Sequence, residues 1–196
     1  KEEFGLDKVL VMPTRNPAYK TISGGVTQQN RIDMIRLAIR DFPYFEFSDL
    51  ELRREGATYT VDTLRELQTK NAEDKYYFIM GADSLFTVDT WHKPQEIFDR
   101  AVVLAANRMD MPGDQLHEQI DYLRERFGGR IGLIEMPDIA VSSRQVRRLC
   151  AQGKPFRYFV PEAVYDYILE HRLYRAEEPQ EEEEEDEGVM KPDRLM

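Results

Sequence analysis

Apolar residues along the chain fall into short runs that alternate with longer stretches of helical periodicity. The short runs predict strands at residues 9–12, 44–52, 76–80, 101–106 and 131–136. Helical spacing, caps and Gly or Pro breaks predict helices starting near residues 27, 60, 94, 115, 142 and 161, and residues 1–5 resemble a helix end closed by Gly5. A repeated strand–helix order indicates an α/β domain whose parallel sheet is covered by helices on both faces.

The stretch from Lys75 to Trp91 organises this prediction. Tyr76–Met80 is almost entirely apolar, which is typical of a strand buried on both faces in the middle of a parallel sheet. It ends at Gly81, where a missing side chain lets a ligand approach the backbone, and Asp83 follows with a carboxylate able to bind ribose hydroxyls. Trp91 is the only Trp, and it either stacks on a flat ring or fills the core.

Other polar groups follow the predicted strands at the same edge of the sheet. Asn107 and Arg108 come directly after the 101–106 run, and Lys20 lies in the polar loop after the first run. Loops at strand carboxyl ends often carry function, so these residues are candidate phosphate ligands, although Arg and Lys are also ordinary surface residues. Thr60, after Tyr59, either caps its helix or offers donors to a substrate carboxylate.

A second informative stretch is Val141–Arg148. Ser142 and Ser143 precede a helix and can cap it, which leaves free backbone N–H groups and the positive end of the helix dipole facing any anion. Three arginines, at 144, 147 and 148, share one face of the first two turns. This arrangement suits a polyphosphate. The alternative is a capped surface helix whose arginines pair with carboxylates.

Charge is distributed unevenly along the 196 residues. Residues 176–196 carry eight Glu and two Asp against one Lys and one Arg, so they account for −8 of the net charge of −10. The domain at residues 1–175 is therefore nearly neutral and offers no basic face for nucleic acid, whereas residues 176–196 have the composition of a disordered acidic tail.

Cysteine content and hydropathy indicate a cytoplasmic protein that does not enter a membrane. Cys150 is the only cysteine, which excludes an internal disulfide and fits a reducing compartment. No apolar stretch is long enough to span a bilayer, and no signal peptide is visible. Because the chain begins Lys-Glu-Glu without Met, we expect that an upstream segment is missing.

Several chemistries find no support in the sequence. His92, His117 and His171 are too far apart for a metal motif, and there is no G-x-S-x-G, Walker A or G-x-G-x-x-G pattern. A sheet edge that holds a ribose, a flat ring and phosphates without a nucleophile suits direct phosphoryl or nucleotidyl transfer.

Many of these stretches together resemble the bacterial nicotinate-nucleotide adenylyltransferases, over residues 1 to about 175. The matching segments are Val-Leu-Val-Met-Pro-Thr at 9–14, Arg31–Ala38, Ala57–Leu64 with its Tyr-Thr pair, Gly81–Ser84 with Thr90-Trp91, Val141–Ser143 with Arg147, and the closing stretch from Tyr158 to Tyr174.

The resemblance implies a Rossmann-like nucleotidyltransferase fold and an enzyme of NAD biosynthesis. Such an enzyme transfers AMP from ATP to nicotinate mononucleotide, giving deamido-NAD and pyrophosphate, with Mg²⁺ as cofactor, and it can be a homo-oligomer. Carried over by position, the mononucleotide would contact Lys20, Tyr59, Thr60, Asp83 and Trp91, with the Trp stacked on the nicotinate ring. ATP would contact Gly81, Asn107, Arg108, Ser142, Ser143 and Arg147.

The chain also departs from the family pattern. The His-x-Gly-His motif that supplies the family's catalytic histidines is absent, together with the first strand and catalytic loop, so no catalytic residue is visible. Tyr19 stands where the family has a His, and Arg144 where it has a Thr. Loss of a strand beside residues 76–80 would leave unpaired backbone groups, so we expect the chain to be unstable or to self-associate.

Three alternatives remain at this stage. The chain could be a non-catalytic relative that binds a nucleotide or a protein partner, a phosphopantetheine adenylyltransferase, or an enzyme that prefers nicotinamide mononucleotide. An intact His-x-Gly-His in a longer sequence would favour the enzyme over the non-catalytic relative. Trp91 and the Tyr59-Thr60 pair suit a pyridine ring rather than phosphopantetheine, but they do not separate the acid from the amide.

Overall fold

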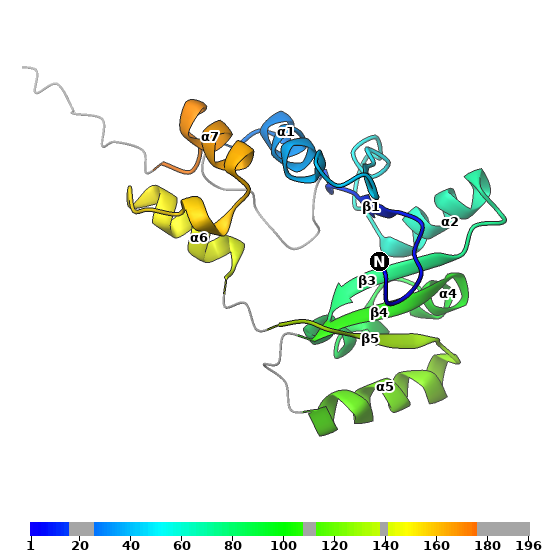
Figure 1. The fold of residues 1–196 in the computed structure, drawn as a ribbon. Coiled ribbons are helices and arrows are strands. Elements are labelled where there is room, and N and C mark those ends of the chain that lie inside the picture. The colour runs from blue at the N-terminus through cyan, green and yellow to red at the C-terminus, as the bar shows by residue number, and fades with distance from the viewer. Residues whose placement is uncertain (16–25, 108–112, 138–140, 176–196) are drawn as a thin grey trace, which may run out of the picture.

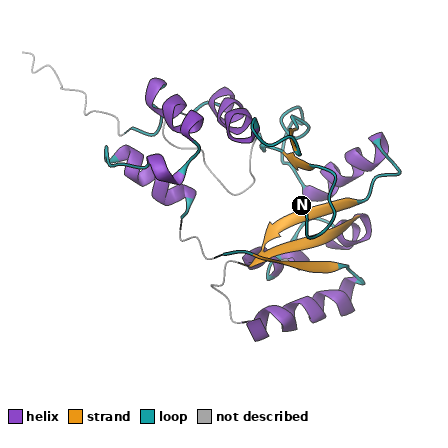
Figure 2. Cartoon of the chain, viewed as in Figure 1, coloured by secondary structure: helices purple, strands orange, loops and turns teal. Residues whose placement is uncertain are grey.

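Helices and strands alternate along the computed structural model, which describes residues 1–15, 26–107, 113–137 and 141–175 (Figures 1 and 2). Its strands are β1 (Val9–Val11), β2 (Phe45–Phe47), β3 (Tyr76–Gly81), β4 (Ala101–Asn107) and β5 (Ile131–Glu135). Its helices are α1 (Gln28–Ile39), α2 (Thr60–Lys70), α3 (Ala82–Leu85), α4 (Pro94–Arg100), α5 (Gly113–Phe127), α6 (Ser143–Ala151) and α7 (Glu162–Glu170). Two short 3₁₀ turns, η1 (Val88–Thr90) and η2 (Arg157–Phe159), complete the described elements.

All the described strand pairs are parallel, as the alternating pattern predicts. β1 pairs with β2, and β3, β4 and β5 form a second sheet in that order. The register places Gly81 opposite Ala106 and Asn107 opposite Glu135. The carboxyl ends of β3, β4 and β5 therefore share one edge, which is where open α/β sheets bind ligands.

The strand buried on both faces is β4 rather than β3. Ala101–Ala105 of β4 are all buried, whereas Ile79 of β3 is 43% exposed. The sequence prediction for residues 76–80 was wrong because β3 lies at the edge of its three-stranded sheet, where only one neighbour pairs with it among the described strands.

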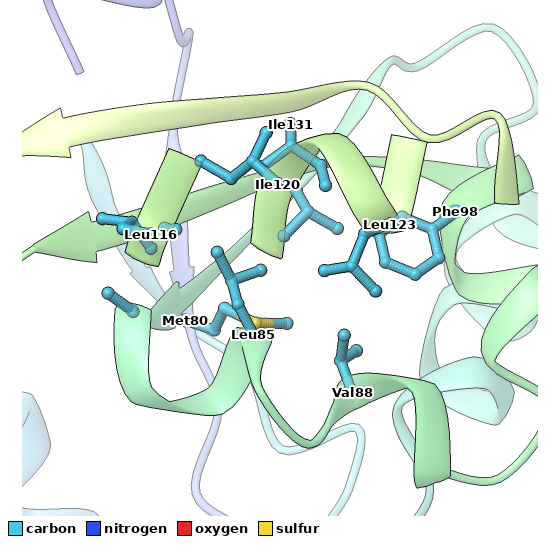
Figure 3. Close-up of a cluster of buried hydrophobic side chains, with 11 residues drawn as sticks. Met80, Leu85, Val88, Phe98, Leu116, Ile120, Leu123 and Ile131 are labelled. Carbon is cyan, nitrogen blue, oxygen red and sulfur yellow. The ribbon is translucent and has the colours of Figure 1, made fainter. Parts of the chain in front are cut away.

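The main core lies between this sheet and the helices on one of its faces (Figure 3). Leu116, Ile120 and Leu123 on α5 recur at helical spacing and pack against alternate strand residues such as Met80 and Val103. Burial of each such side chain contributes about 1.5–3 kcal/mol. On the other face, the ring of Phe4 lies over Gly132 of β5 and beside Leu104 of β4.

Two smaller clusters complete the packing. One joins Val61 and Leu64 of α2 to Ile97 of α4. The other joins α1, α6 and α7, which Figure 1 shows together at one end of the molecule. Among the described residues, this third cluster contains no side chain from β3, β4 or β5.

Two local predictions are confirmed, the helix-like turn that ends at Gly5 and the N-cap at Thr27. Gly5 has φ of +58°, and hydrogen bonds run from Leu6 N to Lys1 O and from Gly5 N to Glu2 O, which is the pairing of a Schellman helix end. Thr27 caps α1, and Asn30 returns a bond to the Thr27 backbone N–H at 2.9 Å, forming a capping box.

The prediction of a strand over residues 44–52 was too long. Only Phe45–Phe47 pairs, because the chain turns at Asp49, whose carbonyl accepts from Leu52 N at 2.9 Å. Leu50 and Leu52 are buried from within this turn, which explains the extended apolar pattern.

No helix in the described part of the chain is long and apolar enough to cross a membrane. The predicted tail, residues 176–196, lies outside the described residues.

Candidate nucleotide-binding site

Strand β3 ends in a tight approach between its last residue and the first turn of α3. Gly81 is the N-cap of α3, and a Cβ added to it would clash with the Asp83 carboxylate. Glycine is therefore required sterically while Asp83 keeps this rotamer. The Asp83 residue is exposed, so its carboxylate is available at the edge where the sequence predicts ribose binding.

The neighbouring strand β4 ends at the same edge, as predicted. Asn107 is its last residue and follows Ala106, the partner of Gly81. Its Oδ1 is buried and finds no hydrogen-bond partner among the described residues. A buried acceptor without a donor costs about 1–3 kcal/mol. The side-chain oxygen of Asn107, at the predicted ATP position, is therefore able to accept a hydrogen bond from a ligand.

The N-terminus of α2 carries the predicted Tyr-Thr pair. Tyr59, 40% exposed, occupies the N-cap in an extended conformation, and no side chain caps the helix. Thr60 is the first helical residue, so the expectation that Thr60 caps this helix was wrong. Asp62 N donates to the carbonyl of Tyr59 at 3.1 Å, which leaves the N–H groups of Thr60 and Val61 and the positive end of the helix dipole without a side-chain acceptor.

The only Trp is half-buried and does serve the core, which was the plainer of its two interpretations. Its ring meets Phe78 of β3 edge-on, with centroids 6.2 Å apart and planes at 72°. The ring of His92, the next residue, instead packs against the ring of Tyr59, with centroids 4.4 Å apart and planes tilted by 35°. This contact brings the loop after η1 to the N-terminus of α2, so Tyr59 and Trp91 belong to one region.

The predicted capped helix forms as α6. Ser142 is its N-cap and accepts from Gln145 N at 3.2 Å, which confirms the capping prediction. Ser143 and Arg147 are exposed, while Val146 and Cys150 are buried on the opposite face. The side of α6 that carries Arg147 is therefore exposed to solvent, and Arg147 forms no ion pair with the described residues.

Arg147 and Arg31 lie in one electrostatic neighbourhood. Burial raises the pKa of the Tyr174 phenol, and both arginines act against that rise. Arg31 also donates to the carbonyl of Thr14 at 2.8 Å, directly after β1. Arg31 therefore lies at the end of β1, and both cations act on the phenol of Tyr174.

The structure gathers the predicted residues into two groups. Gly81, Asp83 and Asn107 share the edge of the sheet, with Tyr59, Thr60 and Trp91 linked through His92 and Phe78. Ser142, Ser143 and Arg147 form the second group, and Figure 1 shows α6 standing apart from the ends of β3 and β4. Lys20 and Arg108 lie outside the described residues.

Sequence reasoning missed two polar residues that support these groups. Glu51 accepts from Thr14 Oγ1 and from Thr63 Oγ1, each at 2.8 Å, and so joins the end of β1 to α2. His92 was considered only as a metal ligand. Its position directly after Trp91 was the available signal, but its partner Tyr59 lies far away in the sequence.

No three His, Cys, Asp or Glu side chains gather into a metal site in the described ranges. Mg²⁺ that binds through the phosphates of ATP needs no such cage, because it keeps several waters and uses one or two carboxylates at most.

Comparisons with known proteins agree with this architecture. Residues 1–149 match the family described as Cytidylyltransferase-like. A protein of Lachnoclostridium phytofermentans, named probable nicotinate-nucleotide adenylyltransferase, is 42% identical over 173 residues, which cover 88% of this chain and 86% of that protein. A protein of the same name from Symbiobacterium thermophilum is 41% identical, covering 87% and 82%.

A solved structure has the same fold. The nicotinic acid mononucleotide adenylyltransferase of Plasmodium falciparum, complexed with NaAD, superposes with a TM-score of 0.68 at 17% identity, covering 86% of this chain and 83% of that one. The sequence identities with the bacterial relatives extend over nearly the whole described chain, so the chain belongs to the nicotinate-nucleotide adenylyltransferase family.

Proposed function

We propose that the chain transfers AMP from ATP to nicotinate mononucleotide, giving deamido-NAD and pyrophosphate. The observation that carries this proposal is the junction of Tyr59, His92 and Trp91 beside β3, the strand that ends at Gly81 and Asp83. The aromatic surface there suits a pyridine ring, and the Asp83 carboxylate at the end of β3 suits a ribose. The family to which the chain belongs supports the same reaction.

On the mononucleotide side, we assign ring contacts to Trp91 and Tyr59. Thr60 lies at the open N-terminus of α2, whose free N–H groups suit the carboxylate on the ring. Asp83 would accept hydrogen bonds from the ribose, and Lys20 would contact the phosphate.

On the ATP side, we assign phosphate contacts to Arg147, Ser142 and Ser143 at the start of α6, together with Arg108. Asn107 offers its buried Oδ1 to a donor on the nucleotide. Gly81 lets the nucleotide approach the backbone at the end of β3.

In the reaction, an oxygen of the mononucleotide phosphate attacks the α-phosphorus of ATP. A P–O bond forms there as the bond to the pyrophosphate oxygen breaks, and both electrons of that bond leave with pyrophosphate. The chain's own residues orient the two substrates and place positive charge and N–H donors around the phosphates. Mg²⁺, which we propose enters with ATP, would neutralise part of the leaving group's charge.

We also place the activity in the cytoplasm. Cys150 is a buried free thiol whose pKa is raised by burial, and its Sγ lies 3.2 Å from the carbonyl of Leu173. Such a thiol is a packing group suited to a reducing compartment.

Pyrophosphate release from ATP and nicotinate mononucleotide tests the function, with nicotinamide mononucleotide in parallel. We would assay the chain as given and the chain extended by a family-type His-x-Gly-His segment. Release with the acid substrate in either form is expected. Trp91→Phe should raise KM for the mononucleotide about tenfold while leaving KM for ATP unchanged, because only the ring contact shrinks. Absence of release in both forms would count against the proposal.

A further inference from the structure

Positive charge is concentrated in the last described part of the chain. Residues 141–175, which include α6 and α7, carry seven Arg or Lys side chains against three Asp or Glu. Residues 1–140 carry eighteen basic side chains against twenty-four acidic ones. The two parts therefore have net charges of +4 and −6 respectively. A polyanion that approaches the protein is drawn to residues 141–175.

Three arginines form an exposed cationic surface on α6. Arg144, Arg147 and Arg148 are spaced three and four residues apart, so they lie on one side of the helix, which we call the arginine face. Within residues 141–175 the only described ion pair joins Arg157 to Glu162, and the arginine face has no described carboxylate partner. Like charges at this spacing repel each other, so an anion that lies across the face stabilises it.

The predicted acidic tail, residues 176–196, starts beside this face. Leu173 is buried in the cluster that joins α6 to α7, and Cys150 Sγ donates to its carbonyl, with 3.2 Å between the two atoms (Figure 1). Tyr174 lies within the electrostatic reach of Arg147, which acts on the pKa of its phenol. The chain is therefore held against α6 two residues before the tail begins.

The tail contains an acidic run that can reach the whole arginine face. This run, residues 181–187, consists of six Glu and one Asp and begins eight residues after Leu173. Eight extended residues span roughly 26–29 Å, whereas the nine residues of α6 span roughly 14 Å. A short flexible tether also keeps the run at an effective concentration of about 1 mM or more near the helix.

We propose that the acidic run docks on the arginine face of α6 in the same molecule and competes there with polyphosphate ligands. Competition with ATP in particular rests on the proposed function, because it presumes that the phosphates of ATP bind at Ser142, Ser143 and Arg147. A single exposed ion pair is weak, but several tethered carboxylates act together on three arginines. The run shares the charge of a triphosphate and lacks a nucleoside, so ATP displaces it.

Neutralising the run should strengthen the binding of ATP. The full-length test variant carries Glu→Gln at 181–185 and 187 together with Asp186→Asn. If the tail occupies the face in about nine of ten molecules, the affinity for ATP rises about tenfold in this variant. Calorimetric titration at low ionic strength measures the change, which should shrink in high salt because screening weakens the docking. Glu118→Gln with Glu125→Gln, two exposed acids on α5, should bind ATP as wild type does.

Lys154 gives a measure of docking that needs no nucleotide. This exposed lysine directly follows α6, and its backbone N–H donates to the carbonyl of Leu149 at 2.9 Å. A carbodiimide joins a carboxylate to a lysine amine only where the two groups meet, so mass spectrometry should find Lys154 cross-linked to residues 181–187. High salt, inorganic tripolyphosphate, or the substitutions Arg144→Gln and Arg148→Gln should largely remove this cross-link.

Arg126→Gln with Arg130→Gln, two exposed arginines away from α6, is the matched control and should keep the cross-link. Absence of the cross-link, or a cross-link that the α6 substitutions leave unchanged, would overturn the inference. Equal ATP affinity of wild type and the neutralised variant would also overturn it, as would cross-links that join isotope-labelled to unlabelled chains. A cross-link that tripolyphosphate displaces, in a chain that neither binds ATP nor releases pyrophosphate, would contradict the proposed function alone.

Discussion

The hydroxyl of Thr63, in the second turn of α2, donates a hydrogen bond of 2.8 Å to Oε1 of Glu51. Thr63 is only 4% exposed, and Arg54 donates to the same hydroxyl at 3.0 Å. The other oxygen of Glu51 accepts from Thr14 at 2.8 Å. One carboxylate thereby fixes the end of β1 against the helix that starts at Tyr59.

Replacing Glu51 with Gln should destabilise the fold. A Gln side chain keeps only one acceptor oxygen and loses the charge, so one of the two Thr hydroxyls must accept from the Gln amide instead of donating to a carboxylate, which weakens the bridge by about 1 kcal/mol. Urea denaturation would measure the loss. Glu46→Gln is the control, because Glu46 is exposed and pairs only with Lys8 at the surface. Equal stability of the Glu51 variant and wild type would show that this bridge does not hold the two segments together.

Replacing Gly81 with Ala should damage binding more than folding. The added methyl group would displace the Asp83 carboxylate from its present rotamer. We expect affinity for nicotinate mononucleotide to fall about tenfold through loss of the ribose contact, with a small change in melting temperature. Gly113→Ala, at the start of α5, adds its methyl group to open space and should leave both quantities unchanged. An unaltered affinity in Gly81→Ala would remove Asp83 from the site.

The sequence predicted these elements best where a pattern was long and local. α2, with its apolar stripe, begins at the predicted residue, and β4, with its continuous apolar run, extends one residue beyond its predicted end. The burial of β3 was mispredicted because it depends on which strands pair with β3 in the sheet. An apolar residue such as Ile79 looks the same in the sequence whether its strand is central or at the edge, so the sequence could not reveal its exposure.

The candidate site residues follow the same rule: local patterns reveal some of them, and contacts between distant parts of the chain reveal the others. Gly81, Asp83, Asn107 and Ser142 could be proposed from sequence because each stands at a predictable strand or helix end, and the structure places each at such an end. Glu51 and His92 were missed because their meaning depends on partners distant in sequence, Thr14 and Tyr59 respectively. Charged or ring-bearing surface residues carry no periodic signal of such a contact.

Ser142→Ala should cost about 1 kcal/mol of stability, because it removes the side-chain acceptor that caps α6. Ser143→Ala, one residue along, keeps the cap and should melt as wild type does. If both serines contact phosphates, both variants should bind ATP more weakly. Calorimetric melting with and without ATP separates the two effects, and a stable Ser142→Ala protein would contradict the capping role.

Stability should fall in acid partly through Glu96. Hydrogen bonds from Arg65 hold the pKa of this carboxyl below its ordinary value of 4.5. A group whose pKa is lower in the folded than in the unfolded state stabilises fully above the unfolded value, and this contribution is lost as pH falls through the folded value. Glu96→Gln should therefore melt with a shallower pH dependence below 4.5 than wild type.

Melting temperatures measured at several acid pH values would test this difference. Glu118→Gln, an exposed position on α5, should keep the wild-type slope. Identical slopes for wild type and Glu96→Gln would show that the Arg65 pairing does not couple to folding.

The free edge of β3 should make the chain self-associate. Among the described strands, β4 alone pairs with β3, and Ile79 projects from this edge strand with 43% exposure. Unpaired backbone groups on an apolar edge recruit further strands. Ile79→Lys should shift the chain toward monomer in sedimentation velocity runs, because a charge on an edge opposes pairing. A concentration-independent monomer for the wild-type chain would refute this.

The third apolar cluster, formed by α1, α6 and α7, has a consequence for how the protein responds to ligand. Among the described residues, it contains no side chain from the sheet that carries Gly81 and Asn107. Arg147 lies exposed on α6, one of the helices of this cluster. The two units can open on separate timescales in the empty protein. A nucleotide touching both acts as a tether, so ATP should slow hydrogen exchange in amides of α6 and α7 that it never contacts.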